Sequence, residues 1–394
     1  MSRPERVFRE LERCCGCGLC AVQCPVGAIE MREDAEGFRY PEIDSARCVR
    51  CGRCRAGCPF RRHSEAETIA ITPSGVYCAR RKDEAALMRS QSGGVFAALA
   101  EALIDAGGVV YGAALEQDAA SVRHRRVDSL AELPPLFGSK YAQSAIEPNI
   151  FETLRHDIET GRPVIFSGTP CQCAAVCALW RPKGRPDNVV VCDLICHSVA
   201  SPRFWRDYVT AISRKQGKKV VGAKFRDKEI GGWRRMVESF ALEDGSCVAG
   251  KLFSRMFSSH LLFRPSCSKC PFTTPNRVSD ITIGDFWGIE NVRPEWATDD
   301  KGASIVLVRT AAGQALLRKA ADSLEIFASD LSQCEQAQLR APVPTPCGRR
   351  TFWAGYKFFG ITWAKLVEIG MRFCASIHRR IGIILPISSR KPSQ

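Results

Sequence analysis

Two copies of one cysteine spacing near the start of the chain constrain its fold more than any other feature. Each copy reads C-x2-C-x2-C-x3-C-P, and the runs contain Cys14, Cys17, Cys20 and Cys24, then Cys48, Cys51, Cys54 and Cys58. Three closely spaced thiolates can hold three irons of one 4Fe-4S cluster, while the fourth cysteine of each run ligates the other cluster. The spacing therefore predicts two clusters, the first held by Cys14, Cys17, Cys20 and Cys58 and the second by Cys48, Cys51, Cys54 and Cys24.

Zinc is the main alternative metal for this segment, because pairs of cysteines also form tetrahedral zinc sites. Two zinc ions would not need the doubled run, nor the prolines that follow the fourth cysteines at Pro25 and Pro59. The pattern therefore favours iron–sulfur clusters and a segment that carries electrons. We expect residues 1–65 to form an α+β ferredoxin-like module, with short strands over residues 28–31 and 38–43.

Composition and charge indicate where the protein works and which partners are not favoured for it. The chain has 394 residues and 21 cysteines, and its first residues lack the apolar core of a signal peptide, so we expect reduced thiols in a cytoplasm. Without a run of about 18 apolar residues, no transmembrane helix is predicted. The net charge is +14, but nine basic residues against one acid lie from Gly348 onward. Because this segment carries more than half of the excess, nucleic acid is not favoured as a partner.

Residues 66–346 alternate between apolar runs typical of buried strands and stretches typical of helices, which predicts an α/β domain. We expect helices over residues 95–106, 147–160, 202–215 and 311–323. The expected strands are 109–115, 164–167, 189–195, 220–225, 235–242, 281–283 and 305–308. Ligands collect at the carboxyl ends of parallel strands, so the residues that follow strands 164–167 and 189–195 are candidates for a site.

A second set of cysteines follows those strands. Cys171 is expected in the first turn of a helix, Cys196 at the end of a strand, and Cys267 and Cys270 form a C-x2-C pair. The four could hold a third cluster. Buried free cysteine is also a common small apolar residue, and from spacing alone the two interpretations are equally good for Cys171 and Cys196.

Seven short segments occur in order along the chain and carry a family resemblance. They are Ser92-Gly93-Gly94, Gly138-Ser139-Lys140-Tyr141, Ser167-Gly168-Thr169-Pro170-Cys171-Gln172, Asp193-Leu194-Ile195-Cys196-His197, Phe225-Arg226-Asp227-Lys228, Cys267-Ser268-Lys269-Cys270-Pro271-Phe272 and the stretch from Asp280 to Gly288. With them the chain resembles the beta-subunit family of coenzyme F-420 hydrogenases and dehydrogenases. The resemblance implies a flavin, FAD or FMN, beside a third 4Fe-4S cluster held by Cys171, Cys196, Cys267 and Cys270.

The residues around two expected helix starts agree with a flavin site. Backbone amides at a helix N-terminus bind phosphate, and the candidates are Ser92, Gly93 and Gly94 at one helix and Ser167, Gly168 and Thr169 at another. Lys140 could neutralise a pyrophosphate, although glycines also serve turns and a single lysine is more often solvated. His197 is either a proton donor or an orienting residue, and Asp285 and Trp287 either line the pocket or form a packed turn. Residues 225–228 are most simply a strand end with a local ion pair, and no catalytic residue is assigned.

These expectations describe a flavin-dependent iron–sulfur oxidoreductase. It would pass electrons through the flavin between 4Fe-4S clusters and a two-electron carrier or substrate, deazaflavin coenzyme F-420 among them. Ferredoxin, a deazaflavin or a nicotinamide carrier is the expected redox partner. Two alternatives stay open, namely a ferredoxin-dependent reductase of an organic substrate and an electron-transfer adaptor subunit without a substrate of its own.

The last segment, residues 347–394, is expected to form a basic amphipathic helical tail. Apolar residues recur at helical intervals at Phe352, Tyr356, Phe359, Trp363, Leu366, Phe373, Ile377, Ile381 and Ile384. Such a stripe either packs on the protein's own core or lies on an anionic membrane surface. The second interpretation would place the protein at the inner face of a membrane.

Overall fold

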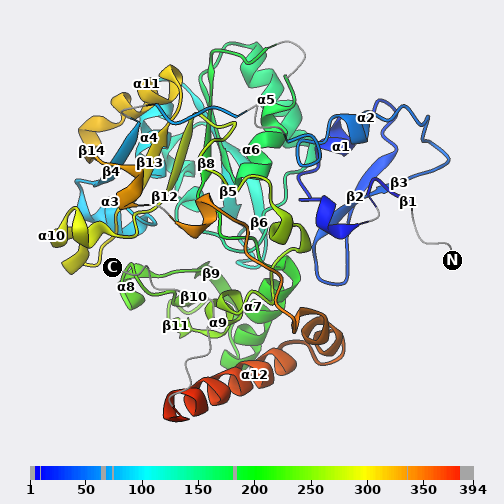
Figure 1. Cartoon of the computed structure of the whole chain (residues 1–394), viewed down its shortest axis with the longest axis vertical. Coiled ribbons are helices and arrows are strands. Elements are labelled where there is room, and N and C mark those ends of the chain that lie inside the picture. The colour runs from blue at the N-terminus through cyan, green and yellow to red at the C-terminus, as the bar shows by residue number, and fades with distance from the viewer. Residues whose placement is uncertain are drawn as a thin grey trace.

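A large mixed sheet forms the centre of the molecule in the computed structural model (Figure 1). The structure describes residues 5–8, 10–63, 68–72, 75–180, 184–334 and 336–381, with side chains as far as residue 374. The strands lie in the order β14 (Leu324–Ala328), β4 (Val76–Arg81), β13 (Ser304–Val308), β12 (Ile281–Asp285), β8 (Val189–Leu194), β7 (Val164–Gly168), β5 (Val109–Leu115) and β6 (Val122–Val127). The four strands from β12 to β5 are parallel to one another, and the outer strands pair antiparallel. The predicted α/β architecture is thus confirmed as a mixed α/β fold.

Helices cover both faces of the parallel strands because the strands are apolar on both sides. Side chains alternate along a strand, so Val110 and Ile165 face a core shared with α4 (Val95–Asp105) and α11 (Ala311–Lys319). Tyr111 and Phe166 face the opposite core, shared with α5 (Pro148–Glu159) and α6 (Pro170–Cys177). The short helices α3 (Glu84–Arg89) and α10 (Pro294–Thr298) lie near the β14 side of the sheet (Figure 1).

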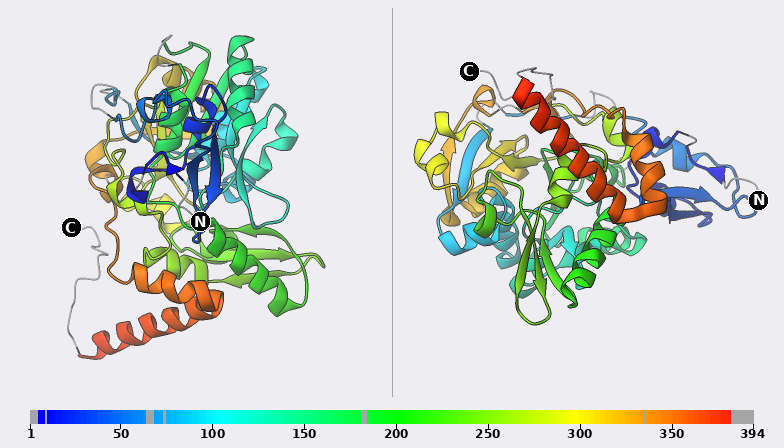
Figure 2. Two further views of the ribbon diagram at one scale, coloured as in Figure 1. Left: turned by 90° about the vertical axis from the view of Figure 1, so that its right-hand side faces the viewer. Right: turned by 90° about the horizontal axis from the view of Figure 1, so that it is seen from below.

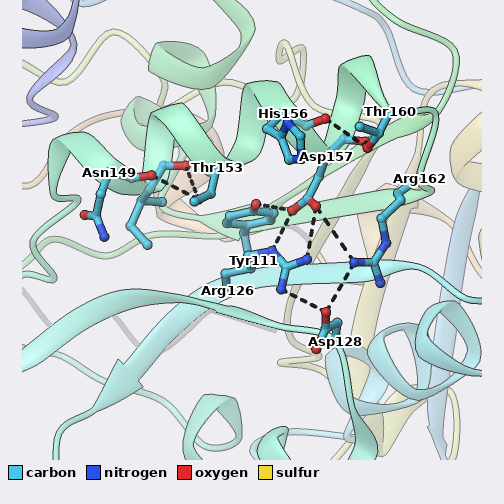
Figure 3. Close-up of polar contacts among 10 residues, drawn as sticks. Tyr111, Arg126, Asp128, Asn149, Thr153, His156, Asp157, Thr160 and Arg162 are labelled. Atoms are coloured by element: carbon cyan, nitrogen blue, oxygen red, sulfur yellow. Dashed lines mark hydrogen bonds and ion pairs between the residues drawn. The ribbon is translucent and has the colours of Figure 1, made fainter.

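A polar cluster fastens α5 to the β5–β6 edge of the sheet (Figure 3). The Asp157 carboxylate accepts hydrogen bonds from the Tyr111 hydroxyl and from Nε and Nη2 of Arg126. Asp128 bridges Arg126 and Arg162. Strand β6 was not predicted, because its sequence VRHRRV lacks the apolar run of a buried strand; its arginines instead form ion pairs at the edge.

A second, antiparallel sheet lies beside the first and consists of β11 (Cys247–Gly250), β10 (Glu238–Leu242) and β9 (Val220–Lys224). It packs with α7 (Pro202–Gln216) and α9 (Leu252–Ser258) around an aromatic core in which Trp205 stacks on Phe225, with ring centroids 3.7 Å apart. The short helix α8 (Lys228–Gly231) connects β9 to β10.

The expected C-terminal helix is present as α12 (Arg349–Ile381), interrupted at Gly360 by non-helical backbone with φ 53°. Its first part buries Phe352 and Tyr356 in the aromatic core of the second sheet. The stripe of apolar residues nevertheless splits, because Phe359, Leu366 and Phe373 are exposed. Of the other stripe residues, the side chains of Ile377 and Ile381 and the whole of Ile384 lie outside the described residues. None of the described helices combines the length and apolar character that crossing a bilayer requires.

The N-terminal segment lies at one end of the molecule (Figures 1 and 2). It has a small antiparallel sheet of β1 (Glu5–Arg6), β3 (Arg39–Ile43) and β2 (Ile29–Glu33), with the single-turn helices α1 (Leu19–Val22) and α2 (Arg53–Ala56). The two strands expected between the cysteine runs are therefore present. Ion pairs from Glu36 to Arg349 and from Glu33 to Arg206 attach the segment to α12 and α7.

Candidate functional site

Four cysteines from three segments of the larger domain come together beside the parallel strands. Cys171 lies in the first turn of α6, and Cys196 follows β8. Cys267 lies in the 3-10 helix Pro265–Lys269, and Cys270 is the residue that ends it. Cys196 is close enough to Cys267, Cys171 and Cys270 for their charges to interact. A half-buried set composed only of sulfur donors suits a 4Fe-4S cluster.

Burial shapes the acidity of these four thiols. It is the largest cause that raises the pKa of Cys267, to about 11, and it also raises the pKa values of Cys196 and Cys270. Cys171 differs, because a hydrogen bond from the Cys15 thiol is the largest of the causes that lower its pKa to about 7. The Thr169 hydroxyl, at the N-cap of α6, lies 3.2 Å from the Cys171 Sγ.

The first cysteine run meets the last cysteine of the second run. Cys20 interacts electrostatically with Cys17, Cys14 and Cys58. Burial, followed by the charge of Cys17, raises the pKa of Cys58 to about 12. The structure thus brings together the four cysteines that the spacing assigns to the first cluster, and their role as its ligands stays a prediction.

For the second predicted cluster, the structure brings only part of the cysteine set together. Cys51 and Cys54 lie close enough to interact, and the Cys24 Sγ accepts a hydrogen bond from the Ala28 amide at 3.2 Å. Cys51 is exposed while the other three are half-buried, so this group lies on the outside of the segment. That Cys24 joins Cys48 stays a prediction. Within the described residues, no three His, Cys, Asp or Glu side chains are near enough to one another to hold a single metal ion.

Two residues that the spacing did not assign lie between the cysteine groups. The Cys15 thiol interacts with both Cys17 and Cys171, one from each group. The buried Arg264 donates from Nε to the Cys14 carbonyl at 2.9 Å and from Nη1 to the Gln143 side chain at 2.8 Å. The doubled cysteine at the start of the first run was the available signal for Cys15, whereas a lone arginine gives no sequence signal.

A cavity of ≈ 2000 Å³ adjoins the four-cysteine group at Cys196. Its lining includes six of the seven predicted flavin-contact residues, namely Ser92, Gly94, Lys140, Ser167, Gly168 and Thr169, together with Cys196 and His197. Cys196 therefore belongs both to the cysteine group and to the cavity wall. Ligand pockets are typically about 300–1,000 Å³, so this cavity has room for more than one organic molecule.

The turn before α4 is held tightly by internal hydrogen bonds. Ser92 has a positive φ of 51°, and its hydroxyl donates to Asp285 at 2.6 Å. The amide of Gly93 donates to the Ser304 hydroxyl and that of Gly94 to the Gln91 carbonyl. Because both glycine amides are used within the protein, a phosphate at this helix would meet the free amides of its first turn instead.

Residues 225–228 follow the end of β9, and Asp227 forms the expected kind of local ion pair, with Lys224 at 3.5 Å. The segment also makes contacts across the fold that were not expected. Arg226 pairs with Asp285, from another strand, at 2.7 Å and lines the cavity. Lys228 is buried and donates to the carbonyls of Leu87, Ser92 and Lys301. Asp285 also accepts from the Trp233 indole at 2.6 Å, so it joins the Ser92 turn to the cavity wall.

Two titratable residues that line the cavity, Lys140 and His197, have lowered pKa values. Burial lowers the pKa of Lys140 to about 7, and its Nζ donates to the Phe137 carbonyl at 2.7 Å. Burial, followed by the neighbouring His260, lowers the pKa of His197 to about 4. The two imidazoles approach to 3.3 Å, and the other nitrogen of His197 lies 2.7 Å from the Gln338 amide. Trp287 stacks on Trp233 at the cavity edge, with centroids 5.0 Å apart.

Two family models match parts of the chain. Residues 13–61 match the 4Fe-4S dicluster domain, so the chain is an iron–sulfur electron-transfer protein. Residues 161–333 match the family model for the C terminus of the coenzyme F420 hydrogenase/dehydrogenase beta subunit. Residues 161–333 therefore belong to the family of this C-terminal domain, in agreement with the resemblance that the sequence motifs indicate.

Among solved structures, the chain is similar to one chain of the F420-reducing NiFe hydrogenase complex from Methanosarcina barkeri. The two are 19% identical with a TM-score of 0.47, and the match covers 71% of this chain and 98% of the other. No curated protein matches the chain significantly.

Proposed function

We propose that the protein is a flavin-dependent iron–sulfur oxidoreductase that moves electrons between a two-electron carrier or substrate and 4Fe-4S clusters. The observation that carries this proposal is the double position of Cys196, which belongs to the four-cysteine group and also lines the cavity. A redox molecule bound in the cavity would therefore lie directly against a cluster ligand.

The proposal assigns three clusters. Two belong to residues 1–65, with Cys14, Cys17, Cys20 and Cys58 as one ligand set and Cys24, Cys48, Cys51 and Cys54 as the other. The third belongs to residues 66–346 and uses Cys171, Cys196, Cys267 and Cys270. The contacts of Cys15 with Cys17 and Cys171 support a short path between the first and third sites.

The cavity is the proposed flavin site. A flavin would supply the exchange between two-electron and one-electron chemistry. Residues of this chain would hold its phosphates by the first-turn amides of α4, by Lys140 and by the N-terminus of α6. Seven Lys or Arg and two acidic residues line the cavity, which supports an anionic occupant. Asp285 and Arg226 would fix the Ser92 turn rather than take part in chemistry.

The test is anaerobic purification of the full chain, followed by quantification of iron, acid-labile sulfide and flavin. About twelve irons and one flavin per chain are expected for three four-iron clusters. Cys196→Ser is expected to lose about one cluster's iron and to slow electron transfer from bound flavin to the remaining clusters. Cys247→Ser, at an exposed position on β11, is the matched control.

Two results would contradict the proposal. Zinc without acid-labile sulfide would replace the iron–sulfur assignment with a structural metal module. Full iron without any flavin would instead identify an electron-transfer adaptor that relies on a partner for its substrate. Deazaflavin, nicotinamide and ferredoxin donors, tested in turn on the same preparation, would identify the redox partner.

A further inference from the structure

The second part of α12, after Gly360, forms part of the cavity wall. Glu368, Met371, Arg372 and Cys374 line the same cavity as Lys140 and Cys196. The buried Glu368 pairs with Arg255 of α9 at 2.7 Å. This part of the helix is therefore fixed against the domain by its inner face.

The outer face of the same segment is apolar and uncovered. Leu366, Ile369 and Phe373 lie three and four residues apart, so they share one side of the helix, and they are 58%, 56% and 67% exposed. Phe358 and Phe359, just before the kink, are also exposed. These five make up nearly half of the eleven large apolar side chains that are exposed in the described chain. Such a concentration marks an interaction surface rather than scattered surface residues.

Positive charge borders this apolar face. Lys357 and Lys365 are exposed beside it, and the nearest acid, Glu368, is turned inward and already paired with Arg255 and Arg372. A second copy of the chain would bring two basic borders together, which is unfavourable. An anionic bilayer offers both an apolar interior for the phenylalanines and negative headgroups for the lysines.

The cavity behind this helix is lined by apolar as well as basic side chains. Phe96, Leu136, Phe257 and Ile283 line it together with Arg234, Arg235 and Arg255. An occupant that satisfies both kinds of wall has an anionic group and an apolar portion. Molecules of that kind partition into bilayers. Figure 2 shows α12 running along the outside of the molecule beneath the second sheet, and its second part supplies residues to the cavity wall.

We propose that the outer face of α12 docks on an anionic membrane and that the cavity takes its second occupant, an amphipathic anion, from that membrane. This inference rests on the proposed function for the identity of the first occupant, the flavin. It adds the chemical class of the two-electron substrate and the surface from which the substrate comes.

The first test measures sedimentation of the full, cluster-loaded protein with two kinds of vesicle. One is phosphatidylcholine alone and the other contains phosphatidylglycerol as well. We expect binding to the anionic vesicles to exceed binding to the neutral ones at least tenfold and to weaken with added salt. The double variant Ile369→Asp/Phe373→Asp should lose this binding, and Lys357→Glu/Lys365→Glu should lose its dependence on phosphatidylglycerol.

Leu130→Asp is the matched control, because it places the same charge on an exposed apolar residue of another surface. It should bind vesicles as the unmodified protein does. Absence of binding to anionic vesicles, equal binding to both kinds, or a salt-stable dimer that buries this face would overturn the membrane assignment.

The second test compares two probes of the cavity, dodecyl phosphate and inorganic phosphate, by calorimetry on the same preparation. Dodecyl phosphate should bind at least tenfold more tightly, and Phe257→Ala should reduce this preference. Equal affinity for the two probes would overturn the assignment of an amphipathic occupant. Iron and flavin contents are measured separately on each variant, so failure of the proposed function would appear as missing cofactor rather than as lost membrane or probe binding.

Discussion

Arg264 holds Cys14 by both its backbone and its thiol. The guanidinium Nε donates to the Cys14 carbonyl at 2.9 Å, and Nη2 lies 3.8 Å from the Cys14 Sγ. The same guanidinium lies over the Tyr40 ring, 4.2 Å from its centroid, and is fully buried. A permanent positive charge is thereby fixed beside the first predicted cluster ligand.

Replacing this cation should alter the electron affinity of the neighbouring cluster. Arg264→Gln is expected to lower the midpoint potential of the first cluster, because a buried positive charge favours the reduced, more negative state. In Arg264→Lys, which keeps the charge but not the forked geometry, the midpoint potential should lie between those of the unmodified protein and Arg264→Gln. Potentiometric titration followed by electron paramagnetic resonance would measure the shift. An unchanged potential in Arg264→Gln, with full iron content, would contradict this role.

Cys15 should be dispensable for metal binding although Cys14 is not. Cys15→Ala is expected to keep the full iron content, because the predicted ligand register uses Cys14, Cys17 and Cys20. Cys14→Ala should lose about four irons. Iron and sulfide analysis of the two variants shows which of the two cysteines is the ligand. Loss of iron in Cys15→Ala but not in Cys14→Ala would make Cys15 the first ligand instead.

Asp285 should control flavin retention through the Ser92 turn. In Asp285→Asn the Arg226 guanidinium loses its ion-pair partner in a buried position, which destabilises the turn by about 3 kcal/mol. We expect the variant to keep its iron but to release flavin on dilution. Asp330→Asn, at an exposed loop position, should retain flavin. Equal flavin content in both variants would rule out this role for Asp285.

Lys140 predicts a pH dependence of flavin binding. Its pKa is lowered to about 7 by burial, so the charged amine is present below that pH and is lost as the pH rises through it. Affinity for an anionic phosphate group should therefore fall between about pH 6 and 8. Lys140→Arg, which stays charged, should remove the dependence, and Lys140→Met should bind weakly at every pH. Flavin fluorescence titrations across this range would measure all three.

The polar cluster on α5 should make acid stability depend on Asp157. Burial alone raises the pKa of this carboxyl, but the hydrogen bonds from Arg126 and Tyr111 outweigh it and leave the pKa lowered. The stabilisation is thus present above the unfolded pKa of about 3.9 and is lost as the pH falls through the folded value. Asp157→Asn should lower the free energy of unfolding at pH 7 by about 2 kcal/mol, and this difference should shrink toward pH 3. Denaturant titrations at the two pH values would check it.

The apolar strands and their helices could be predicted from the sequence because burial on both faces leaves long apolar runs. The expected strand 164–167 and the N-cap Thr169 correspond to β7 and the start of α6. β4 and β14 were not predicted, since they owe their position to pairing with each other and with β13 rather than to a pattern of their own.

The candidate site likewise contains residues that could be predicted from the sequence and residues that could not. The eight cysteines in a fixed spacing could be predicted as ligands from the sequence alone. For the four distant cysteines the sequence left two interpretations equally good, and the family resemblance favoured a cluster. Arg264, Asp285 and Arg226 carry no local signal, because each acts through a partner that is remote in the sequence. The split stripe of α12 also escaped prediction, since periodicity shows which residues share a face but not which of them the rest of the fold covers.

The contact between Arg264 and Cys14 joins residues separated by 250 positions. During synthesis, the first cysteine run therefore emerges long before the arginine that completes its surroundings. Contacts this distant form late in folding, because the intervening chain must first be ordered. A cluster assembled on the nascent N-terminal segment would thus lack the contact with Arg264 until the larger domain has folded. Maturation of the first cluster is in this way tied to completion of the chain.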